Sequence, residues 1–253
     1  MDTSKIKEIS KGIREVKNGG STVWGGSYID TTNSPGPKKL IGGNKYAGFF
    51  GEVSSSELID GEELSKEFRI YEGSLLHRDC GWLKFIYMGQ IEFIAKKPIR
   101  HSISYDHLFY RNATHAEGNY FTIKGKGYSL RLIKGKTEGK QEDSTQWNGT
   151  ILHNSEWNQL LLPICSDAPS NWRYPKNVKS PTKKWANYDP KDLWFETPAV
   201  ALIGSYNWCQ EYGQSTSYRL FRGYTDISGS ANGTPSGTSD NNSWRPVLVY
   251  WGD

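Results

Sequence analysis

The chain has 253 residues, enough for one main domain and an arm, and its ten Trp, fifteen Tyr and nine Phe against two Met indicate a core built largely from aromatic rings. With 31 basic and 27 acidic residues, the net charge of +4 is too balanced to indicate nucleic-acid binding. Three distant cysteines and no long apolar run argue against a zinc site and against membrane insertion. We expect reduced, buried thiols, synthesis in a reducing cytosol, and no metal or other cofactor.

The N-terminal segment predicts a short amphipathic helix followed by an extended arm. A helical apolar stripe is formed by Ile6, Ile9, Ile13 and Val16. The stripe needs a partner, which could be the body of the protein, sister subunits or another protein. Residues 19–51 are rich in Gly, Ser, Thr, Asn and Pro, and we expect them to lie over a surface until Tyr46, Phe49 and Phe50 re-enter the core. We therefore divide the chain into an anchoring helix and arm, residues 1–50, and a body, residues 51–253.

The first part of the body predicts two hairpins and three short helices. A helix or helical turn is expected within residues 56–68, a short one through residues 106–108 after a Ser102 or Ser104 cap, and a third after Ser155. The hairpins pair residues 82–87 with 91–95 and residues 120–123 with 128–133. Lys and Glu alternate with apolar residues in the first hairpin, which indicates one solvated and one buried face.

Residues 167–198 interleave five prolines with aromatic rings, so we expect a long loop. Its candidate ligand-contacting rings are Trp172, Tyr174, Trp185, Tyr188 and Trp194. The alternative is that these rings fold back and pin the loop onto the core.

The last third of the chain predicts strands that tie the C-terminus into the core, around a polar tract at residues 228–242. Tyr224, Asn232 and Asn241 in and beside this tract form a second candidate ligand surface. Structural roles are expected for Trp208, Glu211, Arg222, Trp244 and Arg245. A buried arginine needs a carboxylate or several carbonyls, so we expect Arg222 and Arg245 to join the terminal strands to the body. The alternative for these arginines is a pocket that clamps an anionic sugar or phosphate.

No arrangement of residues predicts catalysis. Asp106 and His107 follow Ser102 and Ser104, but neighbours on one turn rarely point into one site, and helix capping explains the serines. We assign no catalytic residue.

Several strings together resemble a family of tailed-bacteriophage virion proteins whose C-terminal portion is similar to C-type-lectin-like and formylglycine-generating-enzyme-like domains. The resemblance covers about residues 46–253. Its carriers are Gly48-Phe49-Phe50-Gly51-Glu52-Val53, Ser56-Glu57-Leu58-Ile59, Gly81-Trp82-Leu83-Lys84-Phe85, residues 95–100 and 102–106, Tyr128 with Arg131-Leu132, Ser155-Glu156-Trp157, and residues 205–211, 218–223 and 243–251.

The resemblance implies an α+β fold: a C-type-lectin-like domain of short antiparallel hairpins with two or three short helices, preceded by an N-terminal helix and extended arm. The Glu-Pro-Asn, Gln-Pro-Asp and Trp-Asn-Asp triplets of calcium-dependent lectins are absent, so calcium-dependent sugar binding is not carried over. Formylglycine-generating enzymes use a C-terminal cysteine pair, and only Cys209 lies in this region. The shared scaffold is therefore expected without the oxidase activity.

The function implied is that of a non-enzymatic virion structural protein, a tail, fibre or surface-decoration component made in the host cytoplasm. Residues 1–50 would contact other virion proteins, the body would present loops to a host cell-surface glycan, and the protein would form homo-oligomers. Two alternatives stay open: an architectural capsid or tail protein whose aromatic loop is an intersubunit interface, and a degenerate oxidase-like scaffold.

Overall fold

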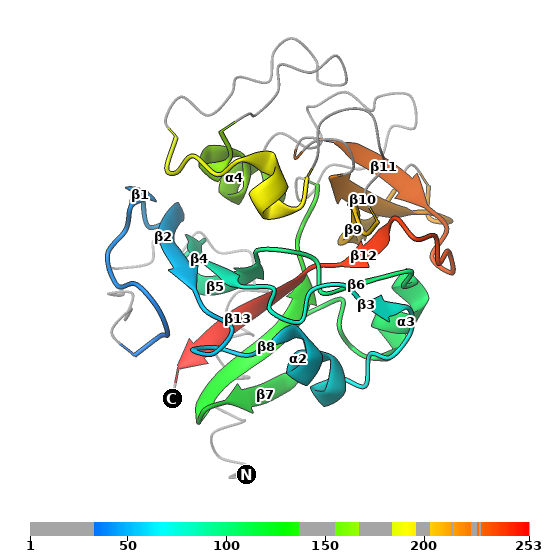
Figure 1. The fold of residues 1–253 in the computed structure, drawn as a ribbon, viewed down its shortest axis with the longest axis horizontal. Coiled ribbons are helices and arrows are strands. Elements are labelled where there is room, and N and C mark those ends of the chain that lie inside the picture. The colour runs from blue at the N-terminus through cyan, green and yellow to red at the C-terminus, as the bar shows by residue number, and fades with distance from the viewer. Residues whose placement is uncertain are drawn as a thin grey trace, which may run out of the picture.

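The protein is described from a computed structural model, which places residues 33–136, 155–166, 184–195, 203–213, 215–223, 227 and 229–252. Within these ranges the chain forms two sheets (Figure 1). The large sheet has seven strands in the order β1-β2-β4-β5-β13-β8-β7, and the small sheet has six in the order β11-β10-β9-β12-β6-β3.

The strands of the large sheet are β1 (Gly42–Gly43), β2 (Ala47–Val53), β4 (Trp82–Tyr87), β5 (Gln90–Ala95), β7 (Tyr120–Ile123), β8 (Lys126–Leu132) and β13 (Pro246–Gly252). Those of the small sheet are β3 (Ser74–Leu75), β6 (Arg100–His101), β9 (Tyr206–Tyr212), β10 (Arg219–Gly223), β11 (Ser230–Gly233) and β12 (Asn242–Trp244). Both predicted hairpins are confirmed as β4–β5 and β7–β8. Their two-residue turns place Met88-Gly89 and Lys124-Gly125 at positive φ, as a twisted hairpin requires.

The C-terminal strand β13 lies in the middle of the large sheet, between β5 and β8 (Figure 1). Leu248 is paired with Phe93 on one side and with Leu130 on the other. The chain reaches β13 directly from β12 of the small sheet, through Arg245. The expectation that the C-terminus is tied into the core is therefore confirmed.

The β4–β5 hairpin is buried on both faces, so the prediction of a solvated face there is wrong. One face carries Trp82, Phe93 and Leu248 in a core shared with the small sheet, and the other carries Leu83 and Ile94 in a second core. Lys84 and Glu92 alternate with these residues as predicted, yet both are buried. Other elements cover both faces of the hairpin, which the local alternation does not reveal.

Within the described ranges, three short α-helices pack around the sheets: α2 (Gly61–Glu67), α3 (Tyr105–Tyr110) and α4 (Glu156–Leu160). Each begins at a side-chain cap, because Asp60, Ser104 and Ser155 accept hydrogen bonds from first-turn amides. The predicted caps at Ser104 and Ser155 are confirmed. Two 3₁₀ turns follow later, η1 (Leu162–Ile164) and η2 (Pro190–Leu193). The described chain is thus a sheet-rich α+β protein.

The start of the body differs from the division predicted at residue 50. β2 runs from Ala47 to Val53 and pairs with β4, so a boundary at that residue would cut a strand of the large sheet. Phe49 and Phe50 are buried as expected, whereas Tyr46 is 60% exposed. The body therefore includes β1 and β2. Residues 1–32, with Ile6, Ile9, Ile13 and Val16, lie outside the described residues.

Candidate functional site

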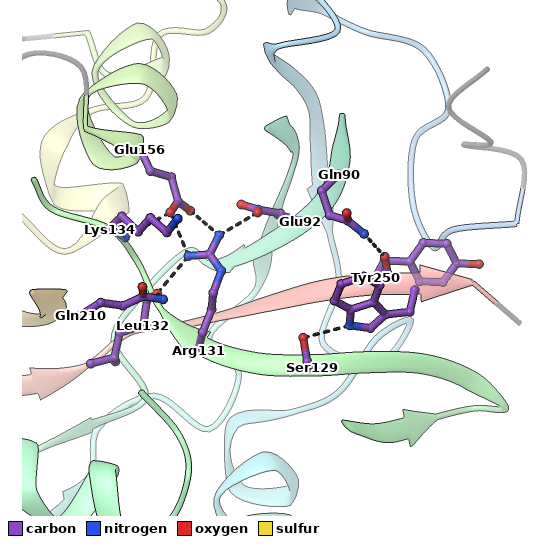
Figure 2. A network of polar contacts seen from close by, with 10 residues as sticks. Gln90, Glu92, Ser129, Arg131, Leu132, Lys134, Glu156, Gln210 and Tyr250 are labelled. Carbon is purple, nitrogen blue, oxygen red and sulfur yellow. Dashed lines mark hydrogen bonds and ion pairs between the residues drawn. The ribbon is translucent and has the colours of Figure 1, made fainter. Parts of the chain in front are cut away.

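Arg131 lies inside the protein between two carboxylates (Figure 2). It extends from β8, and its guanidinium donates to both carboxylate oxygens of Glu156 on α4, each at 2.8 Å. It also donates to Glu92 Oε1 on β5 at 2.6 Å. Because Glu156 is only 1% exposed, this centre lies away from solvent and connects α4 to the large sheet.

The electrostatics of the centre follow from this burial. Burial raises the pKa of Glu92; the charge of Arg131 opposes this rise, and the neighbouring Glu156 carboxyl adds to it. Burial alone would lower the pKa of Arg131, but the two carboxylates raise it above the usual range. The arrangement favours a bidentate Arg131–Glu156 pair beside a Glu92 carboxyl that readily holds a proton.

Backbone groups near Arg131 take part in the network as well (Figure 2). Glu156 accepts from the Lys134 backbone amide at 3.1 Å, and the Gln210 side chain donates to the Leu132 carbonyl at 2.8 Å. Because the Arg131, Glu92 and Glu156 side chains are buried, we interpret the centre as a polar cross-link of strands and helix rather than as an acid–base site.

Arg222 and Arg245 are buried cross-links as well, held by uncharged acceptors. Arg222 donates to the Gly135 carbonyl at 2.9 Å and to Asn158 Oδ1 at 2.6 Å. Arg245 donates to the Lys96 and Leu193 carbonyls, each at 2.7 Å, and to Asn207 Oδ1 at 2.8 Å. Arg245 thus connects the end of β5, the last residue of η2, and β9.

The other residues predicted to be structural lie in or beside the core. Trp208 is buried and donates to the Ile103 carbonyl at 2.8 Å, and Trp244 is buried where β12 leads into β13. Glu211 accepts from the backbone amide of Gly135 at 3.0 Å, and burial raises its pKa to about 7. Its neighbour Cys209 is buried, which raises the thiol pKa and opposes thiolate formation.

The described part of the aromatic segment packs against the body. Trp185 and Tyr188 are half-buried beside the second core, and the Tyr188 ring meets Phe49 edge-on at 6.2 Å. Trp194 is half-buried, donates to the Ile203 carbonyl at 2.9 Å, and lies 4.2 Å from the His77 ring. For these three rings the structure shows the alternative in which they pin the segment down. Trp172, Tyr174 and Tyr224 lie outside the described residues.

The polar tract contains a strand that the sequence did not predict. β11 pairs with β10 and places Asn232, half-buried, opposite Leu220. Asn241 is half-buried in the turn before β12, where its carbonyl accepts from the Tyr206 amide at 2.8 Å. The two asparagines therefore lie on different elements of the small sheet.

The described surface has a concave site where the ends of α2 and α3 meet β7. This pocket, which we call the helix-end pocket, has a volume of about 300 Å³. Its lining includes Glu67, Arg69, Tyr110, Arg111, Asn112 and Tyr120. None of these was among the predicted site residues, because they come from three elements whose ends meet only in the fold.

The sequence also did not predict that Glu92, Arg131 and Glu156 form one buried ionic centre. Arg131 and Glu156 stood within the quoted family strings, but their pairing depends on the packing of α4 against β8. The available signal was a charged residue between two apolar ones in a strand, as in Ile91-Glu92-Phe93 and Leu130-Arg131-Leu132. The same signal did identify Arg222 and Arg245.

Among the residues that the structure describes, no group of three or more His, Cys, Asp or Glu side chains is placed to hold a metal ion. No helix in the described part of the chain is long and apolar enough to cross a membrane. Comparison with family models, curated proteins and solved structures gives no match for this chain. The resemblance to phage virion proteins remains a prediction from the sequence strings.

Proposed function

We propose that the protein is a non-enzymatic structural component of a tailed-phage virion, from the tail, a fibre or the surface decoration, with a C-type-lectin-like body that recognises a host cell-surface glycan. The sequence strings of the body support the family, and the sheet-rich α+β fold is compatible with it. Residues 1–32, with the apolar stripe, would anchor the body to other virion proteins or to sister subunits.

The observation that carries a binding function is the contrast between the interior and the surface. Inside, Arg131, Arg222 and Arg245 make multiple hydrogen bonds that hold strands together. On the surface, Arg69 and Arg111 line an open pocket beside exposed rings. A rigid body with unpaired surface groups suits recognition, because little conformational freedom is lost on binding.

An architectural protein without a host ligand is the second candidate, and the aromatic segment supports it. Trp185, Tyr188 and Trp194 are half-buried against the body, so these rings offer less free area than an exposed recognition loop would. Under this alternative the segment stiffens an intersubunit face. Replacement of Trp185 by Ala would then impair particle assembly. Neither the unchanged protein nor the Trp185→Ala variant would adsorb to host cells in isolation.

Adsorption and assembly measurements test the proposal. The full-length protein and a variant lacking residues 1–32 are incubated with intact host cells, with and without chelator, and each is tested for incorporation into particles. We expect both forms to bind cells regardless of chelator, and only the full-length protein to enter particles. Incorporation without any cell binding would contradict host recognition and leave the architectural function. If the full-length protein neither bound cells nor entered particles, a virion role would be contradicted.

A further inference from the structure

The helix-end pocket is built by two helices that end in the same way. After α2, the Ile70 amide donates to the Ser65 carbonyl at 2.8 Å, and after α3 the Ala113 amide donates to the Leu108 carbonyl at 2.9 Å. This pattern places one residue after each helix in the left-handed region, where glycine is preferred. Those two residues are Arg69 at φ 53° and Asn112 at φ 55°, and both line the pocket.

Arg69 is the unusual member of this pair. Asparagine adopts the left-handed region readily, whereas arginine carries a steric penalty there that glycine would avoid. A strained residue whose side chain lines a pocket points to a use for that side chain. Among the described residues, the guanidiniums of Arg69 and Arg111 have no ion-pair or hydrogen-bond partner, so both are available at the pocket.

Two aromatic rings and a hydrogen-bonded loop complete the pocket. Tyr110 is 80% exposed and Tyr120 is 44% exposed, so both offer ring surface to a ligand. Below them, the buried Asn119 side chain donates to the Asn112 carbonyl at 2.6 Å and accepts from the Leu130 amide at 3.0 Å. These bonds hold the loop between α3 and β7, so the pocket is formed before any ligand arrives.

We propose that the helix-end pocket binds one sugar unit that carries a single anionic group, a carboxylate or a phosphate. Arg69 and Arg111 would hold the anion, because guanidiniums match both groups geometrically. Tyr110 and Tyr120 would pack against the sugar ring. Glu67 reduces the charge of this set to +1, since two cations face one anion, and its carboxylate can accept from sugar hydroxyls. The volume of about 300 Å³ is at the small end for ligand sites and suits one sugar unit.

This inference rests on the proposed function only in naming a host-surface glycan as the source of the sugar. Binding itself can be measured with the isolated full-length protein. The probes are glucuronic acid, glucose 6-phosphate, neutral glucose and inorganic phosphate, followed by isothermal titration and by the amide and tyrosine-ring NMR signals of the pocket. We expect the two anionic sugars to bind and to shift pocket signals, and glucose and inorganic phosphate to bind at least about tenfold more weakly.

The decisive variant is Arg69→Gly, because glycine suits the left-handed backbone and folding should be kept. Loss of a charge-assisted contact predicts affinity for the anionic sugars that is roughly tenfold to a hundredfold weaker. Arg111→Gln should have a similar effect. The matched control is Lys124→Gly, which also replaces a basic residue at positive φ, here 50°, outside the pocket. It should change affinity by less than about twofold, and unfolding midpoints are measured for all variants.

Four outcomes would overturn the inference: no binding of either anionic sugar, equal binding of glucose, equal binding of inorganic phosphate, or unchanged affinity in folded Arg69→Gly and Arg111→Gln. Cell adsorption of the same variants separates the two proposals. Host-cell binding that persists in Arg69→Gly while its sugar affinity falls would contradict host recognition through the pocket, and would keep both sugar binding at the pocket and host recognition by the protein. Sugar binding at the pocket by a protein that does not adsorb to host cells would support the pocket and contradict the host role.

Discussion

Arg131 lies between two buried carboxylates, those of Glu92 and Glu156, and its removal should strongly destabilise the fold. Arg131→Met leaves Glu92 and Glu156 facing each other without a cation. Breaking a buried ion pair from one side typically costs about 3–5 kcal/mol. We expect a loss of that size in the free energy of unfolding, measured by urea denaturation.

Replacing the whole centre by apolar residues tests whether the unpaired carboxylates cause the loss of stability. The triple variant Arg131→Met, Glu92→Leu, Glu156→Met removes the unpaired charges as well and should recover part of the loss, because an apolar cluster of similar volume can replace a buried ion pair. If Arg131→Met alone were as stable as the unchanged protein, the two carboxylates would not depend on this arginine.

The burial of Lys84 predicts that the stability of the fold rises with pH. A lysine whose pKa is raised by an ion-pair partner would give the opposite trend. Lys84 is 0% exposed and donates to Ser34 Oγ at 2.7 Å and to the Pro37 carbonyl at 2.8 Å. Burial, followed by the charge of Lys38, lowers its pKa from 10.5 to about 7. Between these values the unfolded chain binds a proton that the folded protein does not hold, so stability should rise with pH from about 7 to 10.5.

Lys84→Met should lack this rise, and the difference between the two unfolding free energies removes the titrations that both proteins share. One pKa unit corresponds to about 1.4 kcal/mol, so even a third of the shift would give roughly 1.5 kcal/mol across the window. Parallel curves for the two proteins from pH 7 to 10 would show that Lys84 keeps its proton in the fold.

At the scale of elements, β13 should be indispensable because it pairs on both sides. Leu248→Pro removes a backbone donor between β5 and β8 and a buried side chain, and proline is confined to sheet edges, strand starts and bulges because it cannot donate to the ladder. We expect no folded protein by circular dichroism and amide NMR. The control is Ala231→Pro on β11, an edge strand of the small sheet, which should remain folded. Equal loss in both variants would contradict a central role for β13.

The elements themselves were largely predictable because their signals are local. Ser104 and Ser155 indicate helix starts, because their side chains can accept hydrogen bonds from first-turn amides. Turn glycines such as Gly125 indicate the hairpins, because they adopt the positive φ that the turn requires. β11 was not predicted, because Ser, Ala, Asn and Gly have little strand preference and pair only because β10 lies beside them.

The candidate site was less predictable for a related reason. When charged residues alternate with apolar ones, as at Lys84 and Glu92, a buried strand face has the same sequence pattern as a solvated one. Whether such a face is buried depends on the elements that cover it in the fold. The helix-end pocket joins residues 67–69, 110–112 and 118–121, and nothing in any one of these stretches indicates the other two. The arginines 222 and 245 were predictable because their strands are apolar enough to require burial.

At the scale of the whole molecule, Arg245 holds the two sheets together at the point where the chain passes from one to the other. Its guanidinium bonds the Ala95 and Lys96 carbonyls after the large-sheet strand β5, and Asn207 of the small-sheet strand β9. Burial lowers the pKa of Arg245, which shows that keeping this cation inside the protein is unfavourable by itself. Its hydrogen bonds to interior acceptors oppose that penalty.

Arg245→Met tests which of these two effects is larger. The substitution removes the cost of burying a charge but leaves several interior acceptors unpaired, each worth about 1–3 kcal/mol. Because the unpaired acceptors outnumber the one charge, we expect a net loss of about 3 kcal/mol in urea unfolding and faster amide exchange in β5 and β9. Arg78→Met removes an exposed arginine paired with Glu62 at 3.3 Å and should cost less than about 1 kcal/mol. An Arg245→Met protein as stable as the Arg78→Met control would mean that the sheets are held together by their apolar cores alone.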